Sequence, residues 1–271
     1  MSYGFMGGNY FSHKREYSTK AKKHMREMEI EYNEEIDTSV TRSAIYGPEM
    51  PAMSDVDGDL VGPTFYLVNS THSKFIHDVD LADDIVCVHN FASYKNPGGM
   101  FLRGSSAQEE SLCHQSTLYN VLSRIPAFYE WNIEHKNKGL YTDRAIYSPD
   151  IMFRFDEGSF YTSVNVDVLT CAAPNASLMK KYGAFTMDEN KASLERRVSF
   201  ISRILDQQNV HTFITGAWGC GVFEQDPTEV AMLMHMYLQR TNLKKVYFVI
   251  PRGRNYTAFQ KALVRDLVVL S

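Results

Sequence analysis

Residues 85–110 read IVCVHNFASYKNPGGMFLRGSSAQEE, and this stretch decides the fold. Residues 85–90 are apolar and partly β-branched, which predicts a strand. Apolar side chains then recur at helical spacing, so we predict a helix over residues 108–125. A strand that leads through a glycine-containing loop into a helix is the unit from which sheets with parallel strands are built.

The rest of the chain alternates in the same way. Asp226, Pro227 and Glu229 form a strong helix start. Apolar side chains recur at helical spacing over residues 194–205, so Arg197 is expected on the other, solvent-facing side of that helix. This order predicts an α/β fold with a mainly parallel sheet that is covered by helices on both faces. We predict the other strands at 64–69, 164–173, 212–215 and 246–250, and the other helices at 194–205, after 226 and at 255–270.

The composition is that of an ordinary globular protein, with 271 residues, 44% hydrophobic and 22% charged. The length fits one large domain or two small ones, and the apolar content excludes a disordered chain. The formal net charge of −4 argues against a wholesale electrostatic grip on nucleic acid. No apolar run approaches the roughly 18 residues of a membrane-spanning helix, and the N-terminus has no signal-peptide pattern.

The four cysteines, Cys87, Cys113, Cys171 and Cys220, include no CxxC pair. Their wide spacing disfavours a zinc site and a disulfide framework. Three of them lie in apolar runs, where cysteine is usually a small core residue. We therefore expect the protein to work in a reducing, cytoplasmic compartment.

Residues 1–45 differ from the rest of the chain. Basic residues gather from Lys14 onward, and acidic residues follow them up to Glu35. Such charge segregation is typical of a solvated helix or a mobile arm, and a contact with nucleic acid or a protein partner is the alternative. We predict a charged N-terminal extension over 1–45 and one globular domain over 46–271.

The loop after the strand at 85–90 carries the first candidate binding residues. In folds of this kind, ligands bind beyond the carboxyl ends of the strands. Asn90 and Asn96 have amides that both donate and accept hydrogen bonds, which suits sugar hydroxyls. Gly98 and Gly99 allow a backbone with free N–H groups to approach a ligand. A Gly-Gly pair alone is more typical of a plain left-handed turn that closes a strand-to-helix connection.

Gln108, Glu109 and Glu110 follow at the predicted helix start. Two carboxylates in a first helical turn are favourable because of the helix dipole alone, which is the structural alternative to a catalytic role. Neighbours on a helix point about 100° apart, so the two carboxylates are not expected to face one bond from opposite sides. In a catalytic site, one would act as general acid, with its pKa raised by burial, and the other would position a ribose hydroxyl.

A second glycine-containing loop, TGAWGCGVFEQDP at residues 215–227, lies between a predicted strand and a capped helix. Its backbone amides suit a diphosphate. The order GxxGxG and the late position differ from the Rossmann pattern, so we exclude a dinucleotide-dependent dehydrogenase. Phe223 is either a core residue or a contact to a ribose or base. The sequence contains no HExxH, GxSxG or P-loop pattern.

Together these segments resemble the microbial-type poly(ADP-ribose) glycohydrolases of the macrodomain superfamily. The resemblance extends over about residues 60–271, and it implies a macrodomain-like three-layer α/β/α fold with a mixed, mainly parallel central sheet. It is carried by NFASYKNPGGMFLRGSSAQEESLCHQSTLY (90–119), LYTDRAIYSPD (140–150), VDVLTCAAPN (166–175) and ITGAWGCGVFEQDP (214–227).

The resemblance also implies roles for single residues. Glu110 would be the general acid that protonates the departing ribose oxygen, Glu109 would hold the ribose, and Gln108 would support the loop. Phe223 would lie beside the distal ribose. No metal and no cofactor is implied. The diphosphate loop of the family maps onto Gly219, Cys220, Gly221 and Val222.

The implied reaction is hydrolysis of ribose–ribose O-glycosidic bonds, which reverses ADP-ribosylation. The implied partners are poly(ADP-ribose) or ADP-ribosylated proteins, with ADP-ribose as product and without a membrane or nucleic acid. A non-catalytic ADP-ribose-binding macrodomain and a hydrolase of a related ADP-ribose ester or phosphate are the alternatives. One departure from the family is Met100, which stands at the third glycine of the loop and would be strained if its φ were positive.

Overall fold

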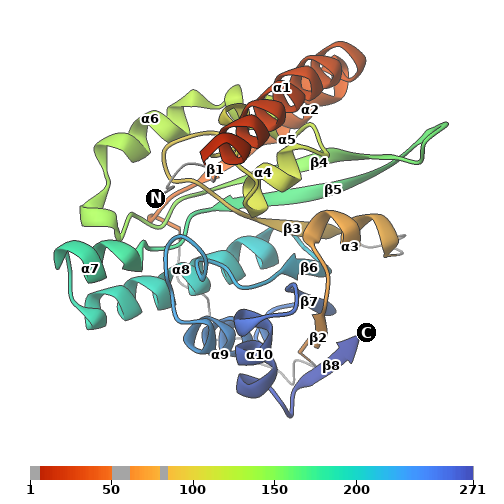
Figure 1. Ribbon diagram of the computed structural model, residues 1–271. Coiled ribbons are helices and arrows are strands. Elements are labelled where there is room, and N and C mark those ends of the chain that lie inside the picture. Colours follow the sequence, from red (N-terminus) through yellow and green to blue (C-terminus); the bar gives the residue numbers. More distant parts are fainter. Residues whose placement is uncertain (1–6, 51–61, 80–84, 271) are drawn as a thin grey trace, which may run out of the picture.

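A computed structural model describes residues 7–50, 62–79 and 85–270, which form an eight-stranded sheet between two layers of helices (Figure 1). The strand order is β1-β4-β5-β3-β6-β7-β2-β8. Strand β4 pairs antiparallel with β1 and β5, and the other pairings are parallel. The strands are β1 (Ala44–Tyr46), β2 (Thr64–Val68), β3 (Val86–Phe91), β4 (Ala145–Asp156), β5 (Tyr161–Cys171), β6 (Thr212–Thr215), β7 (Lys245–Val249) and β8 (Leu267–Leu270).

Helices cover both faces of this sheet, as the alternating sequence pattern predicts. Helices α8, α9 and α10 pack on one face, and α1 to α6 pack on the other. The helices are α1 (Gly7–Glu31), α2 (Asn33–Arg42), α3 (His72–Asp78), α4 (Gln108–Cys113), α5 (Leu118–Ser123), α6 (Pro126–Glu134), α7 (Ala176–Tyr182), α8 (Met187–Gln207), α9 (Pro227–Leu238) and α10 (Arg254–Ala262), with 3₁₀ turns η1 (Phe101–Arg103) and η2 (Asn137–Gly139).

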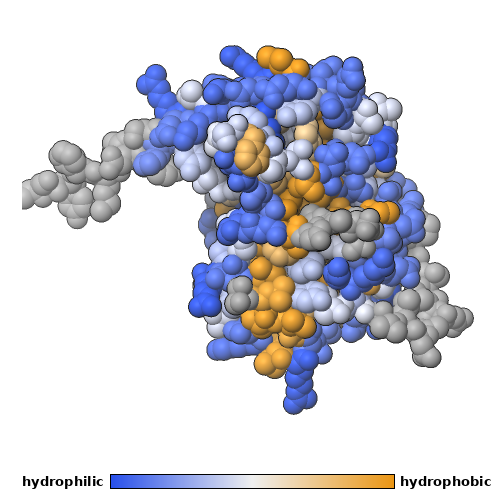
Figure 2. All heavy atoms as spheres, turned by 90° about the vertical axis from the view of Figure 1, so that its right-hand side faces the viewer, coloured by the Kyte–Doolittle hydropathy of each residue, from blue (hydrophilic) through white to orange (hydrophobic). Residues whose placement is uncertain are grey.

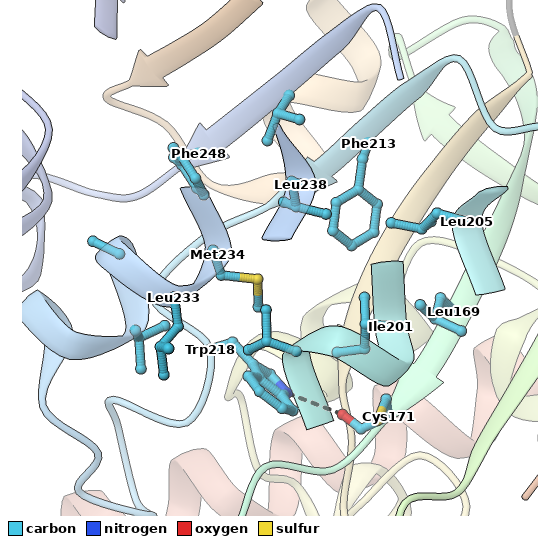
Figure 3. Close-up of a cluster of buried hydrophobic side chains, with 14 of the residues drawn as sticks. Leu169, Cys171, Ile201, Leu205, Phe213, Trp218, Leu233, Met234, Leu238 and Phe248 are labelled. Atoms are coloured by element: carbon cyan, nitrogen blue, oxygen red, sulfur yellow. Dashed lines mark hydrogen bonds between the residues drawn. The ribbon is translucent and has the colours of Figure 1, made fainter. Parts of the chain in front are cut away.

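The core follows the pleat of the strands. In β3, Cys87 faces the layer of α8 to α10, whereas Val86 and Val88 face the opposite layer. Figure 3 shows the first of these two clusters, where Trp218 packs among side chains of α8 and α9. The strands predicted at 64–69, 85–90, 164–173, 212–215 and 246–250 are all confirmed, with ends that differ by a few residues.

The helix predicted over 108–125 is wrong in one respect, because it is broken into α4 and α5. Between them, Ser116 forms an isolated β-bridge with Phe153, and the Ser116 hydroxyl donates to the Leu112 carbonyl oxygen (2.8 Å). The Thr117 N–H then donates to the Met152 carbonyl oxygen (3.0 Å). Hydrogen bonds to the neighbouring strand β4 replace the helical ones, which local periodicity does not reveal.

The final helix predicted over 255–270 is also shorter than expected. Helix α10 ends at Ala262, and residues 267–270 form strand β8, which pairs in parallel with β2. Val268 and Val269 are β-branched and favour the strand once β2 offers a free edge. In Figure 2, which faces this side, apolar residues gather in the lower half, and the exposed side chains on and beside β8 are Val264, Val268, Val269 and Leu270.

Two further expectations need correction. Arg197 is fully buried rather than solvent-facing, because its guanidinium binds Asp143 (2.7 Å) and the Ala172 carbonyl oxygen (2.6 Å). The strands predicted from sequence also did not include the long strand β4, at residues 145–156. A register shift between Ser148 and Ile151 interrupts its alternation, and Asp150 there has φ 56°.

The N-terminal residues described by the structure, 7–42, form helices α1 and α2, which pack on the layer of α4 and α5 (Figure 1). Ala21, Met28 and Ile36 are fully buried in this contact. Charged side chains also pair across this contact, since Arg154 of β4 pairs with Glu31 of α1 (2.6 Å).

The Gly- and Pro-containing stretch after residue 50 lies mostly outside the described residues. No helix in the described part of the chain has the length and apolar character to span a membrane.

Candidate active site

The loops after β3, β6 and β7 surround one continuous cleft. A smaller cavity of about 300 Å³ is lined by Trp218, Phe223 and neighbouring loop residues. A larger cavity of about 830 Å³ adjoins it and extends toward α1 and α10. Phe91, Gln108, Ala217 and Asn255 line both cavities. The cleft therefore lies beyond the carboxyl ends of parallel strands, where the sequence pattern predicted a ligand site.

Gly98 and Gly99 form a turn directly over the two carboxylates. Both have φ +61°, a left-handed conformation that favours glycine. A Cβ on Gly99 would lie 2.5 Å from Glu110 Oε1 and 2.9 Å from Glu109 Oε2. The two neighbouring glutamates were expected to diverge, yet one oxygen of each approaches the same point of this turn. Glycine is required at 99 because it leaves room for both carboxyl groups, and at 98 because a Cβ there would lie 2.7 Å from the Tyr119 ring.

Glu109 is buried and has partners on both oxygens. Asn90 Nδ2 donates to Oε1 (3.2 Å), and the Ser93 N–H donates to Oε2 (2.7 Å). Burial raises the pKa of Glu109 to about 8, and the charge of Glu110 adds to this shift, although the hydrogen bonds oppose it. Glu109 is thus a rigidly held carboxyl group that retains its proton near neutral pH.

Glu110 is held on one side only. The Met100 N–H donates to Glu110 Oε1 (2.8 Å), whereas Oε2 is buried and has no hydrogen-bond partner among the described residues. Met100 has φ −109°, so the methionine at this position carries no left-handed strain, and its backbone supplies the donor that fixes Glu110. One carboxylate oxygen of Glu110 therefore remains available for a further partner.

Gln108 joins the start of α4 to the end of β3. Its Nε2 donates to the His89 carbonyl oxygen (2.8 Å), and its Oε1 accepts from the Phe91 N–H (2.8 Å). The side chain thus acts as a short extension of the sheet and fixes the first turn that carries both glutamates. Because Gln108 also lines both cavities, it connects this frame to the cleft.

The two asparagines have different places. Asn90 is buried beneath the cleft, where it donates to Glu109 and to Thr170 Oγ1 (3.3 Å). Asn96 is exposed, and its backbone rather than its amide supports the turn, since the Gly99 N–H donates to the Asn96 carbonyl oxygen (3.0 Å). The structure brings Asn90 to the carboxylates and keeps the amide of Asn96 at the surface.

The second loop is supported by apolar contacts. Trp218 is fully buried, and its Nε1 donates to the Cys171 carbonyl oxygen (3.0 Å), as Figure 3 shows. Gly219 has φ +74°, and a Cβ there would lie 2.7 Å from the Cβ of Ala173. Gly221 has no neighbour within 4 Å of such a Cβ. The loop is therefore tightly packed at its base and open toward the cleft.

Of the residues predicted in this loop, Gly219, Gly221, Val222 and Phe223 line the smaller cavity. Cys220 does not appear in that lining, and its Sγ donates to the Trp218 carbonyl oxygen (3.5 Å). Val222 is exposed, whereas Phe223 is partly buried and packs near Tyr141, with ring centroids 6.1 Å apart. Phe223 thus belongs both to the cavity wall and to the packing behind it.

Several site residues were missed from sequence. Asn255 and Trp218 line the cavities. Tyr17, from the N-terminal helix α1, lines the larger cavity. Only Trp218 had a local signal, because it stands between glycines in the second loop. The others reach the cleft through contacts between elements that are distant in sequence.

Comparison with known proteins identifies this architecture. Residues 12–155, more than half of the chain, match the family model described as the microbial-type PARG catalytic domain, where PARG is poly(ADP-ribose) glycohydrolase. The chain belongs to this family. No curated protein matches it. The region matched by the microbial-type PARG model includes the glycine turn, both glutamates and most of α1.

Solved structures support the assignment to the microbial-type PARG family. Poly(ADP-ribose) glycohydrolase from Thermomonospora curvata has a TM-score of 0.77 and 25% identity over 92% of this chain and 99% of that chain. The same enzyme bound to the inhibitor ADP-HPD has a TM-score of 0.78 at 25% identity, with the same coverage. The enzyme from Deinococcus radiodurans in complex with ADP-ribose has a TM-score of 0.69 and 26% identity over 84% of this chain and 96% of that chain.

Proposed function

We propose that this protein is a poly(ADP-ribose) glycohydrolase, which hydrolyses ribose–ribose O-glycosidic bonds and releases ADP-ribose. The observation that carries the proposal is the pair of buried carboxyl groups beneath the Gly98-Gly99 turn, which directly follow Gln108, a residue that lines a cleft of nucleotide size. A protein that only binds ADP-ribose has no use for a second buried carboxyl group. Membership in the microbial-type PARG family supports the same reaction.

In this proposal Glu110 is the general acid. Its Oε1 is fixed by the Met100 N–H, and its Oε2, which is buried and has no hydrogen-bond partner among the described residues, would meet the departing ribose oxygen. As the C1–O bond breaks, the Glu110 proton passes to that oxygen and the remaining ribose becomes oxocarbenium-like. A water then adds to C1 and returns a proton to the Glu110 carboxylate, which restores the acid.

Glu109 has a second role in this scheme. Because both of its oxygens accept hydrogen bonds, it is too constrained to follow a leaving group, and it instead positions a ribose hydroxyl. The raised pKa of Glu109 also keeps a proton beside Glu110 at neutral pH.

The second loop is assigned to the diphosphate. Backbone N–H groups between Gly219 and Phe223 border the smaller cavity, and the open surface at Gly221 lets phosphate oxygens approach them. A diphosphate held there would stabilise the positive charge that develops on the nearby ribose. Phe223, in the wall of the same cavity, would pack on that ribose.

The wider setting follows from the same assignment. Poly(ADP-ribose) or ADP-ribosylated proteins would be the partners, and the four cysteines, all free thiols, support a reducing cytoplasmic location. We assign residues 46–271 to the macrodomain-type domain and residues 1–45 to an extension that packs on it.

The decisive experiment measures release of ADP-ribose from poly(ADP-ribose) by the wild type, by Glu110→Gln and by the matched control Glu130→Gln, an exposed residue of α6. Loss of the general acid should reduce the rate about 10²- to 10⁴-fold, while the control keeps it. Equal release by all three proteins would contradict the role of Glu110. If the wild type binds ADP-ribose but releases none from the polymer, the protein is a non-catalytic ADP-ribose-binding macrodomain. If it turns over only a mono-ADP-ribosylated protein or ADP-ribose 1″-phosphate, it is a hydrolase of a related ADP-ribose ester or phosphate.

A further inference from the structure

The charged side chains of helix α1 are of two kinds, paired and unpaired. Every glutamate of the helix pairs with a cation: Glu16 with Lys20 (2.8 Å), Glu27 with Lys23 (3.4 Å), Glu29 with Arg124, and Glu31 with Arg154 (2.6 Å). The basic residues of α1 that have no ion pair with a described residue are Lys14, Arg15, Lys22 and Arg26. The helix therefore carries an excess of positive charge that its own glutamates do not neutralise.

Three of these unpaired residues form a strip on one side of α1, which we call the basic strip. Arg15, Lys22 and Arg26 are all exposed, and spacings of seven and four residues place them on the same side of a helix. From 15 to 26 the strip is about 17 Å long. Ser18 lies between Arg15 and Lys22 at helical spacing, and its hydroxyl donates to the Leu102 carbonyl oxygen (2.7 Å). The basic strip therefore borders the 3₁₀ turn η1.

This turn connects the basic strip to the catalytic loop, because η1 directly follows the Gly98-Gly99 turn in the chain. Arg103 of η1 is exposed, and so is Lys95 on the other side of the glycines. Neither of them has an ion pair with a described residue. The backbone of Lys14 lies against Gly104, immediately after η1. Unpaired positive charge thus begins on both sides of the catalytic turn and continues along α1.

Helix α1 leads away from the catalytic turn over the surface of the molecule (Figure 1). Beyond η1 it reaches the break between α4 and α5, where His24 Nε2 lies 3.0 Å from the Ser116 carbonyl oxygen. It then reaches α5 itself, where Asn120 Nδ2 donates to the Met25 carbonyl oxygen (3.0 Å). The basic strip is therefore fixed to the domain along its length and has one end beside the active site.

A polyanion that leaves the active site beside this turn would meet the basic strip. In the proposed function, the bond cleaved at Glu110 joins the terminal ADP-ribose unit to the rest of the polymer. The rest of the polymer must therefore pass the catalytic loop, and each of its units carries a negatively charged diphosphate. Arginine and lysine bind phosphate oxygens through charge-assisted hydrogen bonds.

We propose that the basic strip, together with Arg103, binds the diphosphates of the polymer units that follow the terminal one. This inference rests on the proposed function for its ligand. Once the terminal unit occupies the cleft, the following units are held at a high effective concentration near the strip, so weak surface contacts add to the affinity of the whole chain. The strip therefore makes the enzyme favour long polymers over short ones.

The experiment measures hydrolysis and binding of long poly(ADP-ribose), and binding of free ADP-ribose, by the full-length chain. The strip variant carries Arg15→Gln, Lys22→Gln and Arg26→Gln, which remove three exposed charges and leave the packed side of α1 intact. Its KM for long polymer should rise about tenfold at low salt, with kcat and the affinity for ADP-ribose unchanged. The slope of log Kd against log salt for long polymer should become shallower by roughly 2, because three phosphate contacts are lost.

The matched control removes three exposed, unpaired charges at the opposite end of the molecule, on and beside α9 and α10 (Figure 1). It carries Arg240→Gln, Lys261→Gln and Arg265→Gln, changes the net charge by the same amount, and should keep the wild-type KM. An unchanged KM in the strip variant, or an equal rise in the control, would overturn the proposal. An equal loss of ADP-ribose affinity in the strip variant would also overturn it, since it would show that α1 is displaced from the cleft.

Two further outcomes separate this proposal from its neighbours. If the wild type releases no ADP-ribose but binds long polymer more tightly than ADP-ribose, and the strip variant loses that difference, the strip stands and the glycohydrolase proposal fails. Single-stranded DNA has phosphates but no terminal ADP-ribose, so it should bind the wild type more weakly than long polymer does. DNA that binds as tightly as the polymer would overturn the proposal in favour of a nucleic-acid surface.

Discussion

Two glycine-containing loops face the same cleft, and they are supported in opposite ways. The turn at Gly98-Gly99 lies on the carboxyl groups of Glu109 and Glu110, which are polar groups that need hydrogen bonds. The loop at Gly216–Gly221 lies on Trp218, Ala173 and other apolar side chains. The first loop is built around proton chemistry, and the second presents a rigid backbone to an anion without adding charge of its own. The following substitutions test this contrast, starting with the largest expected effect.

The first loop should make stability depend on pH through Glu109. Its pKa is raised from 4.5 to about 8 in the folded state, so the folded protein binds this proton more tightly than the unfolded chain. The stability gained from that proton is present below about pH 4.5 and is lost as pH rises to about 8. Glu109→Gln removes this dependence, and Asn90 can flip its amide to accept from the new NH₂ group.

The measurement is urea unfolding of the wild type and Glu109→Gln at pH 5 and pH 8. The difference between the two proteins should change by on the order of 4 kcal/mol between these pH values, in favour of the variant at pH 8. Comparing the two proteins cancels the contribution of titrating histidines. A difference that is the same at both pH values would show that Glu109 is not protonated by burial.

A glycine-to-alanine substitution in each loop tests the difference between the two loops directly. Gly99→Ala places a Cβ 2.5 Å from Glu110 Oε1 in a left-handed backbone, so we expect a loss of about 3 kcal/mol in the free energy of unfolding, together with loss of activity. Gly221→Ala meets nothing within 4 Å and should leave the free energy of unfolding unchanged or raise it by up to about 1 kcal/mol. Urea unfolding measures both, and equal losses would contradict the contrast.

The second loop should lose stability without becoming pH-dependent. Trp218→Phe keeps an aromatic ring in the core but leaves the Cys171 carbonyl oxygen without its indole donor. The expected cost is about 2 kcal/mol in the free energy of unfolding, and it should be equal at pH 5 and pH 8 because no titrating group is involved. Calorimetric unfolding at both values provides the test, and a pH-dependent loss would connect this loop to the carboxylates after all.

Met100→Gly should have only a small effect on stability and activity. The Met100 N–H that holds Glu110 is unchanged by the substitution, and φ of −109° carries no strain that glycine would relieve. We expect a loss of about 0.5–1 kcal/mol in stability from added backbone freedom and a change of less than about threefold in ADP-ribose release. A large gain in release would show instead that the methionine side chain restricts the site.

Local patterns account for the parts of this protein that sequence predicted well. Strands such as β3 and β7 appear as short β-branched apolar runs, and Asp226 caps α9 by accepting from the Thr228 N–H (2.8 Å). The break at Ser116 and the burial of Arg197 were missed because each depends on a partner far along the chain. Ser116 meets strand β4, and Arg197 meets Asp143.

By itself the sequence determined the order of strands and helices, the two glycine-containing loops and the types of side chain that follow them. These features depend on the spacing of apolar residues, on helix capping and on turn chemistry, which all act over a few residues. Only the tertiary structure decided which of two adjacent carboxyl groups is held on both oxygens, that burial raises the pKa of Glu109, and that Tyr17 of the N-terminal helix reaches the cleft. These properties depend on burial and on distances between elements. They exist only after segments remote in sequence have packed together.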